Sequence, residues 1–146
     1  MGFRLPIQDR AFTLTVFADT SVWSLALRRD APPSAPEIGE LRRALDAGVV
    51  YSTGLVLQEL LQGFSKPRAK EQIISHFAAL PLLIPDRDDH IQAAELRRTC
   101  RRRGVQIGTI DALLAELCVR HGLTMLTTDK DFQHVAAVVP MSVWKA

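Results

Sequence analysis

The sequence contains only two cysteines among its 146 residues, and neither lies in a pattern typical of a metal site or a disulfide framework. Cys100 and Cys118 fall in stretches of helical periodicity, with no CxxC motif and no histidine-rich spacing beside them. Their placement argues against zinc and against structural disulfides, and it fits a protein of the reducing cytoplasm.

Long hydrophobic runs, a signal peptide and internal repeats are also missing. No apolar stretch approaches the roughly 20 residues that a membrane-spanning helix needs. Gln8, Asp9 and Arg10 interrupt what would be the apolar region of a signal peptide. The formal charge of +2 permits an anionic partner without requiring one. We therefore expect a cytoplasmic protein without a membrane attachment.

What the sequence does contain is an alternation of short apolar strands and amphipathic helices. Strands are predicted at residues 14–18, 49–51, 82–84, 123–127 and, at an edge, 135–143. Helices are predicted at residues 22–27, 37–47, 54–62, 66–80, 86–103 and from 108 to a turn at 121–122. The alternation predicts one α/β domain, an α/β/α sandwich around a central, mainly parallel sheet of about five strands.

The spacing of apolar residues also predicts which side chains of the later helices face the core. These are Ile73, Ile74, Phe77, Leu80, Ile91, Ala94, Leu96, Cys100, Ile110, Leu113, Leu114, Leu117 and Cys118. Residues 1–13 show no periodicity, so we interpret them as an N-terminal extension before a domain of residues 14–146. Residues 30–36 (DAPPSAP) are predicted to form a loop, in a position to act as a flap beside a site.

Four acidic residues follow strands or begin helices in this pattern. Asp19 follows the first strand, Glu59 lies in the helix after the second, Asp111 is in the first turn of a later helix, and Asp129 follows the fourth strand. In a parallel sheet these positions share one edge, so we expect the four carboxylates to lie close together. Hydroxyl groups and one further acid adjoin them, namely Thr20, Ser21, Thr128 and Asp131.

Two of these acids also have a simpler explanation. In that explanation Asp19 or Ser21 only caps the helix that follows, and Glu59 faces solvent, as most helical glutamates do. Taken together, however, carboxylates gathered without matching basic residues repel one another unless a cation neutralises them. Oxygen ligands favour Mg²⁺ or Mn²⁺, which can activate water for attack on a phosphodiester, with one ion or with two about 4 Å apart.

Arginines crowd the end of the helix before Asp111. A basic helix end interacts favourably with the helix dipole and is usually a solvated face. The same side chains are candidates to hold a nucleic-acid backbone beside the acids. Both interpretations stay open for Arg97, Arg98, Arg101, Arg102 and Arg103.

Four segments together resemble the PIN-domain ribonucleases, specifically the VapC-like toxins of toxin–antitoxin pairs. They are Asp19-Thr20-Ser21-Val22-Trp23, Gln58-Glu59-Leu60, Thr109-Ile110-Asp111-Ala112-Leu113-Leu114-Ala115 and Leu126-Thr127-Thr128-Asp129-Lys130-Asp131-Phe132. The resemblance extends from residue 14 to about residue 143. The extension of residues 1–13 departs from it, because such toxins usually begin a few residues before the first acid.

The resemblance implies a strand order of 3-2-1-4-5 and Mg²⁺- or Mn²⁺-dependent cleavage of RNA, such as tRNA or rRNA. It assigns metal binding and catalysis to Asp19, Glu59, Asp111 and Asp129, with Asp131 as an additional candidate. It also implies a homodimer, and a cognate antitoxin that inserts into the active-site groove and can build a larger hetero-oligomer. Trp23, Leu25, Leu27 and Phe64 are candidates either for an apolar partner groove or for the core.

Two other functions compete with this interpretation. A PIN-like domain that only binds nucleic acid or a partner would have lost one or more of the acids, and none is lost here. A phosphatase of the haloacid dehalogenase type would need a second Asp two residues after Asp19, where this sequence has Ser21.

Overall fold

The computed structural model describes residues 14–28 and 35–146 of the chain. The predicted extension of residues 1–13 and most of the predicted flap lie outside these residues. Pro36, assigned to that flap from the sequence, is instead the first residue of a helix, where its missing N–H costs nothing.

Five strands form one parallel sheet in the order β3-β2-β1-β4-β5, as predicted. The strands are β1 (Val16–Ala18), β2 (Val50–Thr53), β3 (Leu82–Leu83), β4 (Thr124–Leu126) and β5 (Ser142–Val143). The helices are α2 (Thr20–Leu27), α3 (Pro36–Ala47), α4 (Gly54–Gly63), α5 (Pro67–Ala78), α6 (Arg87–Arg102), α7 (Thr109–His121) and α8 (Asp131–Ala136).

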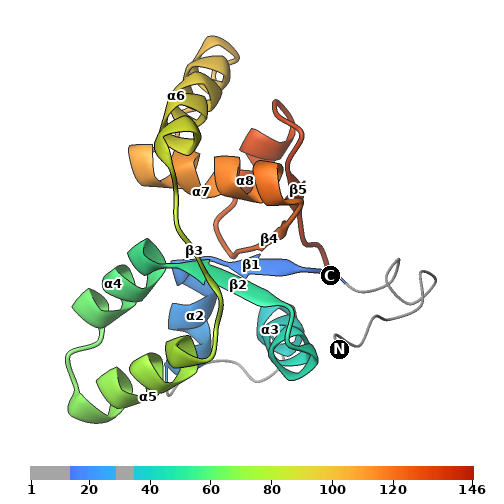
Figure 1. Cartoon of the computed structure of the whole chain (residues 1–146). Coiled ribbons are helices and arrows are strands. Elements are labelled where there is room, and N and C mark those ends of the chain that lie inside the picture. The colour runs from blue at the N-terminus through green and yellow to red at the C-terminus, as the bar shows by residue number, and fades with distance from the viewer. Residues whose placement is uncertain (1–13, 29–34) are drawn as a thin grey trace, which may run out of the picture.

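The helices form two layers around this sheet. Figure 1 shows α2, α3, α4 and α5 below the strands and α6, α7 and α8 above them. The central strand β1 pairs with both β2 and β4, so that Val16 lies opposite Val50 and Thr124. All three residues of β1 are fully buried, which explains why the strand is uniformly apolar rather than alternating. The predicted α/β/α sandwich is therefore confirmed.

Helix α7 ends as its sequence predicts. Gly122 adopts a left-handed conformation with φ 63°, and its N–H donates to the carbonyl groups of Cys118 and Val119. Glycine tolerates this conformation without steric cost, and the chain turns directly into β4. Within the described part of the chain, no helix has the length and apolar character needed to span a membrane.

Several predicted positions are wrong in detail. The last strand is short, because residues 131–136 of the chain form α8, and only Ser142–Val143 pairs with β4. In α6 the inward face is Asp89, Ala93, Leu96 and Cys100, so Ala94 faces solvent. Large apolar side chains predicted to be buried are instead exposed, namely Ile74, Ile91 and Ile110.

Candidate active site

Asp19 lies where β1 ends and α2 begins, and only 6% of it is exposed. Its Oδ1 accepts hydrogen bonds from Ser21 Oγ at 2.6 Å and from the Val22 N–H at 3.3 Å. Its Oδ2 accepts one from Thr127 Oγ1 at 2.6 Å. Asp19 therefore does cap α2, as the simpler explanation held, and the same bonds fix its carboxylate at the carboxyl edge of the sheet. Burial raises the pKa of Asp19, and these hydrogen bonds oppose that rise.

Hydroxyl groups join the end of β4 to the end of β1. Thr127 Oγ1 accepts a hydrogen bond from the Asp129 N–H at 2.9 Å, and Ser21 Oγ accepts one from the Thr128 N–H at 3.0 Å. Thr128 thus contributes its backbone rather than its exposed side chain. The sequence-based candidates did not include Thr127 as a supporting residue, although a buried threonine at the end of a central strand was a usable signal. Thr20, which they did include, forms no side-chain hydrogen bond within the described residues.

Asp111 occupies the first turn of α7 and is half-buried. Burial raises its pKa from 3.8 to about 6, with further contributions from the negative charges of Asp129, Asp19, Glu59 and Asp131. Like charges nearby disfavour ionisation of a carboxyl group, in the same direction as burial does. In the parallel sheet, the end of β1, the start of α7 and the loop after β4 lie at the carboxyl edge, which places Asp19, Asp111 and Asp129 there.

The five carboxylates are neighbours without being clustered at ligand distance. Among the described residues, no three acidic, histidine or cysteine side chains are close enough to hold one ion together. Mutual repulsion between like charges favours such separation. Asp129 Oδ1 accepts a hydrogen bond from the Asp131 N–H at 2.9 Å, which orients Asp129 on the loop after β4. Glu59 is half-buried on α4.

The five candidate arginines differ in their surroundings. Arg97 and Arg101 border a hollow of about 470 Å³ that Asp111 and Asp131 also line. Arg98 faces elsewhere and pairs with Glu95 at 3.4 Å. Arg102 and Arg103 are exposed at the end of α6.

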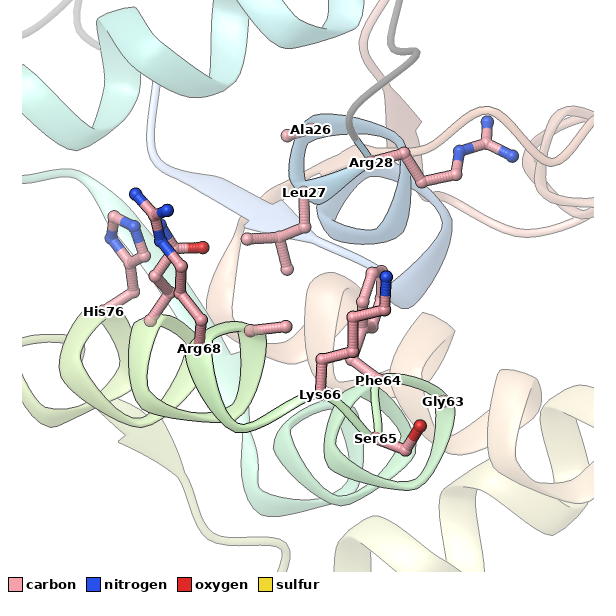
Figure 2. A pocket seen from close by; sticks show the side chains of 11 residues that line it. Ala26, Leu27, Arg28, Gly63, Phe64, Ser65, Lys66, Arg68 and His76 are labelled. Carbon is pink, nitrogen blue, oxygen red and sulfur yellow. The ribbon is translucent and has the colours of Figure 1, made fainter.

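A second hollow, of about 740 Å³, lies between α2 and α5. Figure 2 shows Leu27 pointing into it from α2, with Phe64, Lys66, Arg68 and His76 on the opposite side. Its lining combines apolar side chains, among them Leu27 and Phe64, with the basic side chains of Arg28, Lys66 and Arg68.

The structure distinguishes the four residues that were candidates for a partner groove or for the core. Leu27 and Phe64 line this hollow. Trp23 belongs to the core, where it is 2% exposed and its ring lies 5.0 Å from that of Phe77. Leu25 is half-buried and does not line the hollow.

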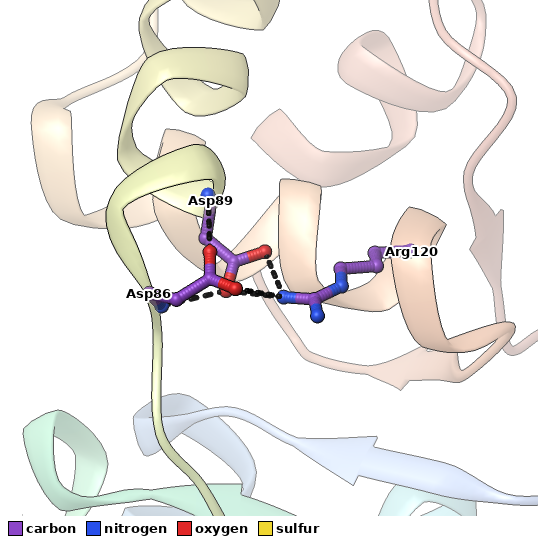
Figure 3. Close-up of polar contacts among 3 residues, drawn as sticks. All are labelled: Asp86, Asp89 and Arg120. Carbon is purple, nitrogen blue, oxygen red and sulfur yellow. Dashed lines mark hydrogen bonds and ion pairs between the residues drawn. The ribbon is translucent and has the colours of Figure 1, made fainter.

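An ion pair at the far end of α6 and α7 fixes the two helices that carry Arg101 and Asp111. Figure 3 shows Arg120, from the end of α7, reaching Asp89 at the start of α6. Arg120 Nη1 lies 2.6 Å from both Asp89 oxygens, and Asp89 also completes a capping box with Asp86. Burial alone would raise the pKa of Asp89, but hydrogen bonds from the Asp86 N–H and from Arg120 outweigh burial and hold that pKa below its usual value.

A parallel sheet of order 3-2-1-4-5 with acids at its carboxyl edge defines a class of α/β domains whose sites form where neighbouring strands diverge. The particular family follows from comparison: the PIN domain profile matches residues 16–138, and the chain belongs to this family.

The chain is also similar in sequence to a named ribonuclease and in fold to solved structures. Ribonuclease VapC11 of Mycobacterium tuberculosis is 28% identical over 125 residues, which cover 84% of this chain and 92% of that protein. The chain also resembles the crystal structure of FitAcB from Neisseria gonorrhoeae, with a TM-score of 0.67 and 22% identity over 89% of this chain and 96% of that one. The DNA-bound VapBC structure from Salmonella typhimurium has a TM-score of 0.66 and 20% identity over 90% of this chain and 98% of that one.

Proposed function

We propose that the protein is a metal-dependent endoribonuclease and the toxin of a VapBC-like toxin–antitoxin pair. The observation that carries the proposal is the placement of Asp19, Asp111 and Asp129 at the carboxyl edge of the sheet of a chain that belongs to the PIN domain family. Such a concentration of negative charge is unfavourable for a folded domain by itself. It is useful when a cation and an anionic substrate meet there.

The side chains at this edge fit a hard divalent cation. Asp19, Glu59, Asp111 and Asp129 offer only carboxylate oxygens, with Asp131 beside them, and this donor chemistry suits Mg²⁺ or Mn²⁺. When bound, such an ion neutralises charge on the phosphodiester and makes water a better nucleophile. The chain's own contribution is to hold these carboxylates ready. Hydroxyl donors fix Asp19, and the Asp131 N–H orients Asp129.

The two competing functions are less compatible with these contacts. A domain that only binds would not need the unfavourable charge around Asp111. For the phosphatase, the position that should carry a general acid holds Ser21, whose hydroxyl donates to Asp19 as a positioning group.

The proposal is tested with purified protein and a short RNA. We expect cleavage with Mg²⁺ or Mn²⁺ and none with EDTA. The variants Asp19→Asn and Asp111→Asn should lose cleavage while keeping the circular dichroism spectrum of the folded protein. Asp46→Asn, which removes an exposed carboxylate on α3, is the matched control and should cleave like the wild type. Cleavage that persists in EDTA, or in both site variants, would contradict the proposal.

The proposed function also includes two protein partners, a cognate antitoxin and a second copy of the chain. We propose that a cognate antitoxin docks in the hollow between α2 and α5, where apolar side chains such as Leu27 and Phe64 lie among basic ones and suit an amphipathic, acidic segment. We also propose a homodimer, formed through an apolar hollow of about 490 Å³ between α6 and α7 that Leu55, Ala94 and Ile110 help to line. The RNA substrate is proposed to be a tRNA or an rRNA.

A further inference from the structure

Of the five arginines toward the end of α6, Arg97 and Arg101 border the hollow that Asp111 and Asp131 also line. Neither forms an ion pair with those acids within the described residues. Arg97 donates from Nε to the carbonyl oxygen of Ile107 at 2.8 Å, whereas no side-chain hydrogen bond holds Arg101 within the described residues. Opposite charges therefore face one hollow of about 470 Å³ without neutralising each other directly.

The wall of this hollow is fixed by hydrogen bonds of the turn between α6 and α7. The Val105 N–H donates to the Cys100 carbonyl at 2.8 Å, and the Arg97–Ile107 bond ties the same turn back to α6. Gly104 adopts φ 80°, a conformation that permits the sharp turn. The hollow is thus formed before any ligand arrives, which lowers the entropic cost of binding.

We propose that this hollow is a subsite for the RNA phosphate next to the one that is cleaved, and that Arg101 is the side chain that binds it. The inference rests on the proposed nuclease function and names one arginine of the five. A guanidinium group can give two parallel hydrogen bonds to phosphate oxygens, which fixes the position of the strand as well as its charge. A hollow of this volume is within the range of ordinary ligand sites.

The negative charges around the hollow explain why a positively charged side chain is needed there to bind a phosphate. A strand whose reacting phosphate approaches Asp111 brings further phosphates toward the same carboxylates, and those phosphates are repelled. Arg101 offsets this repulsion on the side of Asp131. Because the neighbouring phosphate does not react, its contact is the same in the ground state and in the transition state. Loss of Arg101 should therefore raise KM and leave kcat nearly unchanged.

The experiment compares Arg101→Ala with Arg102→Ala. Both variants remove one positive charge from the end of α6, but Arg102 does not border the hollow. Binding of a short, fluorescein-labelled single-stranded RNA of mixed sequence is measured by anisotropy in EDTA over a range of salt concentrations. The loss of one phosphate contact should make the slope of log K against log salt shallower by about 0.7. We expect that change, and a roughly tenfold weaker affinity, for Arg101→Ala alone. Arg101→Lys, which keeps the charge, should restore most of the slope.

Several outcomes would overturn the inference. Equal slopes for the two alanine variants would show that the arginines act only through their summed charge. A fall in kcat without a rise in KM would place Arg101 in the chemistry rather than in this subsite. Arg101 also borders the apolar hollow between α6 and α7, so the mass of each variant is measured by light scattering. A binding defect that accompanies a change in mass would also count against the subsite.

The inference and the nuclease proposal fail in different ways. If the wild type cleaves RNA while Arg101→Ala and Arg102→Ala bind alike, the subsite is wrong and the nuclease stands. If the wild type binds RNA with the expected difference between the variants but never cleaves it, the nuclease is wrong and the phosphate site stands.

Discussion

Thr127 at the end of β4 donates its hydroxyl hydrogen to Oδ2 of Asp19 at the end of β1, at 2.6 Å. The two residues are 108 positions apart in the sequence, and the parallel pairing of β1 with β4 brings them together. The same hydroxyl oxygen accepts the Asp129 N–H. One threonine thus sets the relative position of two candidate metal ligands.

Replacement of Thr127 by valine keeps its shape and removes both bonds. We expect kcat for RNA cleavage to fall about 10–100-fold, because a displacement of catalytic groups by about 1 Å has effects of this size. The free energy of unfolding should fall by about 1–3 kcal/mol, since a buried carboxylate loses a donor. Thr128→Val is the control, because Thr128 is exposed and uses only its backbone N–H. Equal activities for the two variants would show that the Thr127 hydroxyl does not position the site.

The substitution Asp111→Asn should have opposite effects on stability and on activity. Its pKa is raised in the folded protein from 3.8 to about 6, so it favours folding below pH 3.8 and loses that contribution as the pH rises through about 6. Asp111→Asn should therefore raise the free energy of unfolding at pH 7, in denaturant titrations without metal, while it abolishes cleavage. The stability difference between the two proteins should become small near pH 4.

Added metal should reverse that order of stability. An ion present at about 1,000 times its Kd stabilises the wild type by about 4.1 kcal/mol. The variant, which lacks one ligand, should gain much less. A variant that is less stable than the wild type without metal would contradict the role of charge repulsion at this edge.

The Asp89–Arg120 ion pair should contribute to stability rather than to catalysis. Arg120→Met leaves the buried Asp89 carboxylate without its guanidinium partner, and we expect Tm to fall by about 2–4 °C. Arg102→Met, at an exposed position of α6, is the control. The pKa of Asp89 is lowered in the folded protein, so this contribution is present above pH 3.8 and disappears as the pH falls through the lowered value. The two variants should therefore have similar Tm values in strong acid. A persistent difference there would exclude the ion pair as the cause.

The strand order was predicted from the resemblance of four short motifs to a known family, and the structure has that order. The parallel sheet itself was predicted from the alternation of strands and helices, and a parallel sheet brings Asp19, Asp111 and Asp129 to one edge regardless of side-chain detail. The prediction of the fold required only the periodicity of apolar residues and the resemblance of four short motifs.

Local side-chain environments were harder to predict. Residues 135–143 contain enough valine to suggest a strand, yet α8 takes the first two because the helix that begins at Asp131 continues through them. Ile110 has the spacing of a core residue, but it lies in the first turn of α7, where a hollow rather than the core adjoins it. Thr127 was missed because its importance depends on a partner 108 residues away.

The exposure of Ile110 leads to a prediction about assembly. It is 43% exposed and lines the apolar hollow between α6 and α7 with Leu55 and Ala94. If a second copy covers this surface, Ile110→Lys should convert a dimer into a monomer in light scattering after gel filtration, because a buried ammonium group is costly. Ile84→Lys is the matched control, since Ile84 is 88% exposed at the end of β3 and does not line this hollow. A dimer that withstands Ile110→Lys and dissociates with Ile84→Lys would place the interface on the β3 side of the sheet instead.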